Sequence, residues 1–428
     1  MEYTNTSERK ERVVLAGVHT GSKNVIEDTN EQSLEELGRL VDTAGAEVVG
    51  SLLQNKSYIE SSTYIGEGKV EELKAACETL DADIVIFDDE LTGSQVRNLE
   101  KLTGKTVIDR SMLILDIFAA RALTKEGKIQ VELAQLKYMI PRLIGIGASL
   151  SRLGGGIGTR GPGETKLETD RRHIRSRIGH LEKELKEIKK HRELLRSRRK
   201  KEGIPVAALV GYTNAGKSSL LNILTNADVL VEDKLFATLD PTARSIELSD
   251  GRKVLLVDTV GFIRKLPHHL IEAFKSTLEE AVLADVLIHV VDSSSEEIEQ
   301  HIAVVNNLLN ELGAENKPII TVYNKIDLKR DDLRLPEARE EANRSIEISA
   351  LTGKGIDKLL EILEDVVPGK KTKIRVCIPY WEGNMVSQVH EECDVLNEEY
   401  AENGTIMDIY VDSIMFGRLK KYVVGSDS

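Results

Sequence analysis

With 428 residues, the chain is too long for one compact core, and its length favours about three domains. Its three cysteines form no CxxC pair, which argues against a zinc site or a disulfide framework and for a reducing compartment. The net charge of −13 argues against nucleic-acid binding by the chain as a whole, and the polar first residues and short apolar runs lead us to expect a cytoplasmic protein with no signal peptide and no membrane span.

The first part of the chain alternates short β-rich runs with helical patterns. The expected strands are 13–18, 47–53, 84–87 and 106–108, and the expected helices are 33–43, 69–80 and 94–102. Strands separated by helices of this length predict right-handed crossovers and a small parallel sheet. We place this N-terminal α/β domain at residues 1–115 and find no catalytic constellation in it.

Two helical patterns with heptad spacing come next, in a segment that we place at residues 116–202. One apolar seam consists of Ile129, Leu133, Leu136, Ile140 and Leu143, and the other of Ile178, Leu181, Leu185, Ile188 and Leu195. Two seams joined by one loop predict an antiparallel helical hairpin. Between residues 168 and 201 the second helix carries 14 Lys/Arg against 6 Asp/Glu, which makes it a basic element on an acidic protein.

The loop between the two helices, at residues 150–168, is rich in glycine and arginine. Long irregular loops inside compact domains are uncommon and are usually functional or disordered. Glycines permit close approach to a phosphate backbone, and basic side chains neutralise it. The predicted RNA contacts are Arg152, Gly154, Gly155, Gly156, Arg160 and Lys166. The alternative is a solvated hairpin whose tip is a passive connection.

The nucleotide motif begins where a continuous apolar run, 206–210, ends. Eight residues of the form GxxxxGKS follow and lead directly into a helical pattern at 219–224, the setting that a phosphate-binding loop requires. The predicted nucleotide contacts are Gly211, Tyr212, Thr213, Asn214, Ala215, Gly216, Lys217, Ser218 and Ser219. Lys217 would reach the β- and γ-phosphates, and the Ser218 hydroxyl would bind Mg²⁺.

A switch segment is expected between this loop and the next strand. Its predicted nucleotide contacts are Phe236, Ala237, Thr238, Leu239 and Asp240. Such a segment offers a threonine hydroxyl to Mg²⁺ when GTP is bound, and Thr238 and Thr242 both qualify on chemistry alone.

A second buried strand, 254–257, ends in the sequence DTVG. Asp258 stands where a carboxylate is needed behind the magnesium ligands, and the Gly261 amide can meet the γ-phosphate and sense its loss. The predicted contacts in this motif are Asp258, Thr259, Val260 and Gly261.

Base identity is predicted from the sequence NKID, which closes the strand 319–323. A carboxylate at Asp327 can accept from guanine N1–H and N2–H₂ together, whereas adenine offers no such pair of donors. Asn324 would tie this loop to the phosphate-binding loop, and an amide near Ser349 would face guanine O6. The predicted contacts are Asn324, Lys325, Ile326, Asp327, Ser349, Ala350 and Leu351. We place the GTPase domain at residues 203–369.

The last segment, residues 370–428, predicts a small α+β domain. It opens with an alternating strand at 374–378, followed by a helix at about 382–396. Asn403-Gly404 predicts a hairpin turn between strands at 398–401 and 405–411. The fold class is therefore α/β: a P-loop GTPase domain preceded by a small parallel α/β domain and a helical hairpin, and followed by a small α+β domain.

These motifs resemble the GTPases related to Obg and Era, and most closely the HflX family of ribosome-associated GTPases. The resemblance rests on FATLDPT at 236–242, DTVGFI at 258–263 and the glycine loop at 150–168, and it covers nearly the whole chain. It implies that Thr238 rather than Thr242 binds Mg²⁺, so that Lys217, Thr238 and Gly261 carry catalysis. It also implies that Phe262 stands where related proteins place a water-orienting glutamine, and that Asn214 helps bind K⁺.

The resemblance further implies a monomeric GTPase that binds the large (50S) ribosomal subunit and its rRNA and dissociates stalled or idle 70S ribosomes. An alternative is an NTPase, using ATP as well, that acts in 50S assembly or rRNA remodelling. A subunit of an RNA-modifying enzyme is disfavoured, because the N-terminal domain carries no cofactor fingerprint and Cys77 lacks an evident partner base.

Overall fold

The structure is a computed structural model that describes residues 9–20, 30–150, 162–201, 203–225, 234–236, 239, 242–266, 278–328, 344–369, 372–411 and 413–424. The chain divides into two compact units. The first comprises residues 1–192, 231–240 and 260–278, and the second comprises 193–230, 241–259 and 279–428. Within the described ranges, no helix combines the length and the apolar character needed to cross a membrane.

The first unit begins with a four-stranded parallel sheet in the order β2-β1-β3-β4. Its strands are β1 (Arg12–His19), β2 (Glu47–Asn55), β3 (Ile84–Phe87) and β4 (Thr106–Asp109), and its helices are α1 (Asn30–Ala44), α2 (Glu67–Thr79), α3 (Gly93–Thr103) and α4 (Arg110–Arg121). The predicted parallel sheet is confirmed. Helix α4 follows β4 without a loop, because the Asp109 carboxylate caps it by accepting from the Met112 amide.

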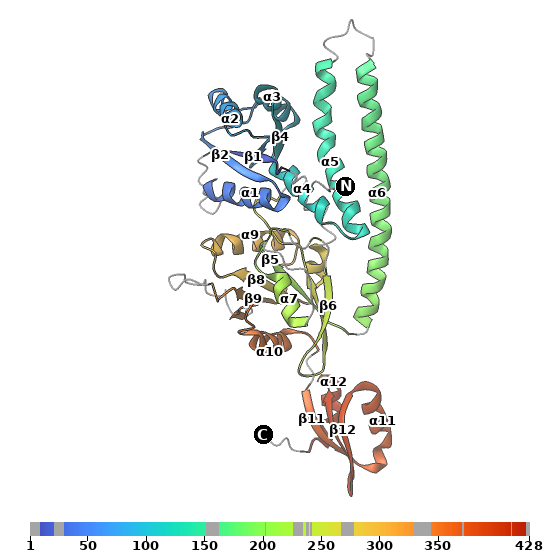
Figure 1. Cartoon of the computed structure of the whole chain (residues 1–428). Coiled ribbons are helices and arrows are strands. Elements are labelled where there is room, and N and C mark those ends of the chain that lie inside the picture. Colours follow the sequence, from blue (N-terminus) through green and yellow to red (C-terminus); the bar gives the residue numbers. More distant parts are fainter. Residues whose placement is uncertain are drawn as a thin grey trace, which may run out of the picture. The chain divides into compact units, whose positions relative to one another are not determined.

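The predicted helical hairpin is also confirmed, as α5 (Lys125–Leu150) and α6 (Pro162–Lys201) lie side by side (Figure 1). Their seams meet in one apolar cluster that consists of Ile129, Leu133 and Leu181 with Leu136, Ile178, Leu185 and Ile188 packed against it. The expected tip loop is too long at its second end. Helix α6 starts at Pro162, since proline is pre-organised for the first helical position, and Lys166 therefore lies in the helix rather than in the loop.

The second unit is built around a six-stranded sheet in the order β10-β9-β8-β5-β7-β6, in which β6 alone is antiparallel to its neighbour. The strands are β5 (Val206–Gly211), β6 (Thr242–Glu247), β7 (Lys253–Asp258), β8 (Val286–Asp292), β9 (Ile319–Asn324) and β10 (Arg344–Glu347); the helices that cover them include α7 (Lys217–Thr225), α9 (Ile298–Glu311) and α10 (Ile356–Val366).

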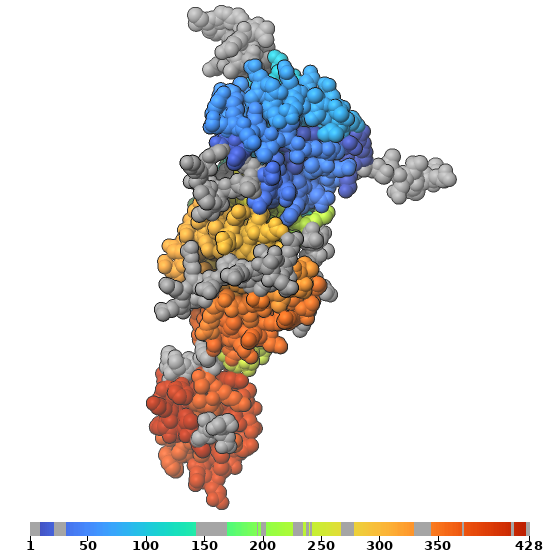
Figure 2. All heavy atoms as spheres, turned by 90° about the vertical axis from the view of Figure 1, so that its left-hand side faces the viewer, coloured from blue at the N-terminus to red at the C-terminus, as the bar shows by residue number. Residues whose placement is uncertain are grey.

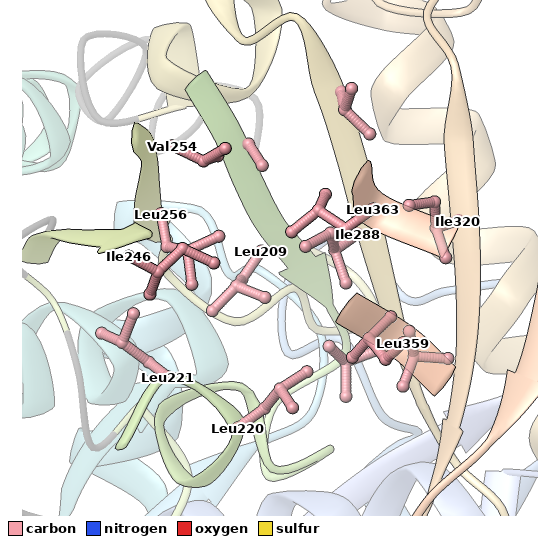
Figure 3. Close-up of a cluster of buried hydrophobic side chains, with 14 of the residues drawn as sticks. Leu209, Leu220, Leu221, Ile246, Val254, Leu256, Ile288, Ile320, Leu359 and Leu363 are labelled. Atoms are coloured by element: carbon pink, nitrogen blue, oxygen red, sulfur yellow. The ribbon is translucent and has the colours of Figure 1, made fainter. Parts of the chain in front are cut away.

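Aliphatic side chains hold this sheet to its helices, as Figure 3 shows for Leu209, Ile288 and Ile320 of the strands and for Leu220 and Leu359 of the helices. Strands β5 and β8 are buried along almost their whole length, as expected for central strands of a sheet covered on both faces. This rigid core fixes the strand ends from which the candidate site is built.

The C-terminal segment forms a three-stranded antiparallel sheet in the order β11-β13-β12. It consists of β11 (Thr372–Ile378), the 3₁₀ turn η2 (Tyr380–Glu382), α11 (Gly383–Glu392), β12 (Asp394–Ala401), β13 (Gly404–Val411), α12 (Ser413–Leu419) and the 3₁₀ turn η3 (Lys420–Tyr422). Figure 2 shows these residues as one rounded body, coloured orange to red.

Two sequence expectations for this segment are wrong in detail. The helix ends at Glu392 rather than near residue 396, because β12 already begins at Asp394 and pairs with β13, which places Val395 against the core. The hairpin turn lies one residue earlier than expected, since Ala401 pairs with Gly404. The predicted fold class is confirmed, and the division into four domains stays a prediction.

Candidate nucleotide-binding site

The phosphate-binding motif lies where β5 ends and α7 begins, as predicted. Gly211 has φ of 154°, and an added Cβ would stand 2.2 Å from the Val290 carbonyl oxygen of β8, so only glycine fits there. Asn214 and Gly216 also have positive φ, at 60° and 93°, which turns the loop back toward the helix. The first amides of α7 are thereby left at a helix N-terminus, where backbone donors and the helix dipole favour an anion.

Lys217, the first residue of α7, is buried and retains its ammonium inside this loop. Its Nζ donates to the carbonyl oxygens of Gly211, at 3.1 Å, and Tyr212, at 2.8 Å. Burial lowers the pKa of Lys217 to about 8, although the charge of Asp258 opposes the shift. A buried cation held only by neutral carbonyls can gain much from a phosphate, because Coulomb attraction is strong where water is excluded.

Ser218 and Asp258 bring two hard oxygen donors together. The Ser218 hydroxyl donates to Asp258 Oδ2 at 2.7 Å, and the Asp258 side chain is fully buried at the end of β7. Thr259 Oγ1 donates to the Leu209 carbonyl at 2.6 Å and so ties the end of β7 to β5. Hydroxyl and carboxylate oxygens suit Mg²⁺, which usually keeps several waters and phosphate ligands. Among the described residues, no group of three or more His, Cys, Asp or Glu side chains is placed to hold a metal ion.

Asn324 joins three loops, which follow the carboxyl ends of β5, β9 and β10. Its Nδ2 donates to the Ala215 carbonyl and its Oδ1 accepts from the Ala350 amide, both at 2.9 Å. An added Cβ at Gly216 would lie 2.2 Å from this Nδ2, which gives that glycine a packing role as well as a conformational one. The predicted tie of Asn324 to the loop at 211–218 is present as the hydrogen bond to the Ala215 carbonyl, and the contacts of both loops with a nucleotide stay predictions.

The other residues predicted to contact the base lie in the loops that follow β9 and β10. Lys325 has φ of 63°, and its Nζ lies 2.7 Å from Asp292 Oδ2. Asp327 is exposed, so its carboxylate is accessible to a ligand, while Ser349 is fully buried and Leu351 is 84% exposed.

Residues of the predicted switch segment, up to Asp240, and the end of the DTVGFI motif, from Val260, belong to the first unit. Phe236 is buried with φ of 55°, and its ring packs edge-to-face with that of Phe118, with 4.7 Å between the ring centroids. Phe262, which follows Gly261, is 1% exposed. Val260 and Leu239 are buried as well. The other predicted switch and loop residues, Ala237, Thr238, Asp240, Arg152, Gly154, Gly155, Gly156 and Arg160, lie outside the described residues, as does the side chain of Lys166.

Two residues near the phosphate loop were missed from the sequence. His301 of α9 stacks on the ring of the loop residue Tyr212, with 3.9 Å between ring centroids and 16° between planes, and so packs the loop against that helix. His289, in the middle of β8, is buried, and burial together with the nearby charge of Lys217 lowers its pKa to about 4. Neither pairing leaves a sequence signal, because each partner comes from a different element.

The segment that follows DTVGFI is held by a buried ion network that was also missed. Arg110 is 1% exposed and donates to Asp88 Oδ1 at 2.8 Å, to Glu36 Oε1 at 3.0 Å and to the Arg264 carbonyl at 3.3 Å. Lys265 Nζ donates to Asp88 and also to Asp89, at 2.8 Å in the second case. Burial lowers the pKa of Arg110, but the charges of Asp88 and Glu36 outweigh it and the net shift is upward.

The fold and these loops define the class: a P-loop GTPase domain, with β6 antiparallel at the edge of an otherwise parallel sheet. Family models match residues 31–119 (GTP-binding GTPase N-terminal), 121–199 (GTP-binding GTPase Middle Region), 206–325 (50S ribosome-binding GTPase) and 335–413 (HflX C-terminal domain).

Whole-length relatives agree with these models. The chain is 52% identical to GTPase HflX of Caldanaerobacter subterraneus subsp. tengcongensis over 97% of this chain and 94% of that protein, and 42% identical to GTPase HflX of Escherichia coli over 89% of both. The chain therefore belongs to the HflX family of GTPases, and the predicted family and enzyme class are confirmed. Among solved structures, a GTP-binding protein from Sulfolobus solfataricus in complex with GDP is 28% identical with a TM-score of 0.43, covering 83% of this chain and 98% of that one.

Proposed function

We propose that this GTPase binds GTP·Mg²⁺ at the β5–α7 loop and binds the 50S ribosomal subunit, and that its nucleotide state controls the dissociation of stalled or idle 70S ribosomes. The nucleotide assignment rests on the two hydrogen bonds that Asn324 makes with Ala215 and Ala350, since they join the phosphate loop to the loop bearing Asp327. The ribosomal part is supported by the family model described as a 50S ribosome-binding GTPase and by the basic helix α6.

In this proposal the chain's residues divide the work of phosphate transfer. Lys217 and the amides of the loop at 211–219 neutralise the β- and γ-phosphates, as preorganised donors do most effectively where water is excluded. Ser218 and Thr238 would hold Mg²⁺, with Asp258 orienting Ser218; when bound, the metal would withdraw charge from the phosphate oxygens. The Gly261 amide would read the γ-phosphate, and Asn214 would help hold K⁺.

Guanine selection would rest on Asp327. Its exposed carboxylate can accept from guanine N1–H and N2–H₂. The Ala350 amide donates to Asn324 Oδ1 and so fixes the loop that would face guanine O6. Replacing Asp327→Asn should weaken GTP binding by about 2–3 kcal/mol, because charge-assisted hydrogen bonds are lost, and should favour xanthosine triphosphate. Equilibrium binding of fluorescent guanosine diphosphate and xanthosine diphosphate measures the loss of affinity and the change of preference. The control is Asp357→Asn, at an exposed site on α10. Unchanged GTP affinity in Asp327→Asn would remove this residue from the site.

The ribosomal proposal is tested by sedimentation of 70S particles with the protein and a non-hydrolysable GTP analogue. Disassembly into subunits supports the splitting function. Association with immature 50S particles, without disassembly of 70S, supports the alternative role in assembly or rRNA remodelling.

The hairpin tip would supply the rRNA contact. Changing Arg152, Arg160 and Lys166 to Gln should weaken 50S binding and reduce the slope of log affinity against log salt by up to ~2–3, taking ~0.7–0.9 per phosphate. Changing Lys10, Lys74 and Lys101 to Gln removes three exposed charges elsewhere and should leave the slope unchanged. A tip variant that keeps the wild-type slope would make the loop a passive connection.

A further inference from the structure

Three exposed aromatic rings lie at one end of the C-terminal sheet. Tyr380, Trp381 and Tyr400 are 55%, 83% and 77% exposed. Aromatic residues make up only 4% of the chain, and Trp381 is its single tryptophan. Clustered exposed apolar groups cost free energy in water and often mark interaction sites. Three exposed rings in one small domain of a chain with few aromatic residues therefore form a surface suited to a partner.

The strand register brings Tyr380 and Tyr400 together, and Trp381 follows Tyr380 in the chain. Ile378, the last residue of β11, and Tyr400 of β12 pair with the same residue of β13, Thr405, from its two sides. Two residues after Ile378, the Tyr380 hydroxyl donates to the Ala401 carbonyl at 2.7 Å. Tyr380 therefore reaches across the end of β13 to the residue next to Tyr400, and the chain continues directly into Trp381.

The surroundings of the rings are acidic. From residue 379 to residue 402 the sequence holds seven Asp or Glu and no Lys or Arg. Three of these carboxylates, Glu382, Glu392 and Glu399, pair with Lys421, Arg418 and Arg375 from other elements, so the balance of this surface stays negative. The hydrogen bond from Tyr400 to Glu398, together with the charge of that carboxylate, raises the pKa of Tyr400 above its ordinary value. Glu382 lies next to Trp381 in the sequence. Phosphates would be repelled here, so single-stranded RNA, which also stacks on aromatic rings, is disfavoured.

We propose that the ring cluster of Tyr380, Trp381 and Tyr400 is a docking site for an arginine-rich protein segment. Guanidinium groups stack on aromatic faces and also pair with carboxylates through two parallel hydrogen bonds, so one arginine uses both features of this surface. Tryptophan and tyrosine are enriched among the residues that carry most of the binding energy at interfaces. The site is separate from the nucleotide loops and does not depend on the function proposed for them.

Trp381 permits a local test in the full-length protein, because its fluorescence reports only on this surface. The probes are nona-arginine, nona-lysine and an oligouridylate of nine nucleotides. We expect a saturable change of the Trp381 emission with nona-arginine. Nona-arginine should bind at least about threefold more tightly than nona-lysine, because the two peptides carry the same charge but only the guanidinium group stacks well on aromatic rings. Tyr400→Ala should abolish this preference for arginine.

Two controls separate stacking from general attraction to an acidic protein. Tyr58→Ala removes a ring that is 58% exposed in the first unit and should leave the titration unchanged. Tyr400→Phe keeps the ring and should keep the preference. Equal affinity for the two peptides, a preference that survives Tyr400→Ala, tighter binding of the oligouridylate, or no saturable change would each overturn the proposal.

Discussion

Lys217 in the second unit and Arg110 in the first are both buried cations, and their surroundings differ sharply. No carboxylate stands within 4.0 Å of Lys217 Nζ among the described residues, and its pKa falls to about 8. Arg110 meets two carboxylates, at 2.8 Å from Asp88 and 3.0 Å from Glu36, and its pKa rises.

This difference separates a buried cation that can bind a ligand from one that stabilises the fold. A cation whose charge is already neutralised within the fold has little left to offer a ligand, whereas a desolvated cation held by neutral carbonyls keeps its charge for an anion. The Arg110 network instead holds the segment that follows DTVGFI by paired charges. Strongly perturbed pKa values thus mark a binding residue only when the direction of the shift is taken into account.

The largest effect is expected from Lys217→Ala. Loss of the charge facing the β- and γ-phosphates should slow GTP hydrolysis by about 10²–10³-fold. Single-turnover hydrolysis measures this, with exposed Lys253→Ala as the control. The volume-conserving Lys217→Met should leave thermal stability without nucleotide equal or higher, because a buried charge without a carboxylate partner costs desolvation energy. Wild-type turnover in Lys217→Ala would contradict the assignment.

Arg110→Met should instead destabilise the first unit, by about 3 kcal/mol, because it leaves Asp88 and Glu36 buried without their main counter-charge. Urea unfolding, followed by hydrogen exchange of peptides from β1 and β3, assigns the loss to this unit. Adding Asp88→Asn and Glu36→Gln should restore part of the stability. A single-variant loss below about 0.5 kcal/mol would mean that the network is not structural.

The third prediction uses the depressed pKa of Lys217. The ammonium must be protonated to pair with phosphate, so nucleotide binding should take up a proton above pH 8: less than about 0.1 proton at pH 7 and about three quarters of a proton at pH 8.5. Calorimetric titration with GDP in two buffers of different ionisation enthalpy measures the uptake. Uptake that does not increase between these pH values would place the lysine away from the phosphates.

The smallest effect is expected from Lys265→Met. Its side chain is 30% exposed, so solvent screens its pairs with Asp88 and Asp89, and the loss should be about 0.5–1 kcal/mol and decrease with salt. The expected loss of stability would be measured as faster hydrogen exchange in residues 260–266. Arg9→Met, which breaks an exposed pair with Asp81, should have no measurable effect. An equal response from both variants would make the Lys265 contacts ordinary surface pairs.

Local patterns determined much of this protein from the sequence alone. The β5–loop–α7 unit was predictable because its glycines and apolar strand are contiguous, and the hairpin seam through Leu133 and Leu181 was predictable because heptad spacing repeats along one chain. The end of the tip loop was not predictable from the sequence. Helix α6 starts at Pro162, several residues earlier than expected, and this earlier start does not change the apolar pattern.

Tertiary structure decided the rest. Strand order brought Asn324 to Ala215, 109 positions apart in the sequence, and placed Tyr212 on His301. It also made Arg110 a structural cation rather than a surface one, since its partners come from α1, from the end of β3 and from a segment 154 positions away. Such residues look like ordinary charges in the sequence, because whether a charge is neutralised, exposed or kept for a ligand depends on which elements the fold packs around it.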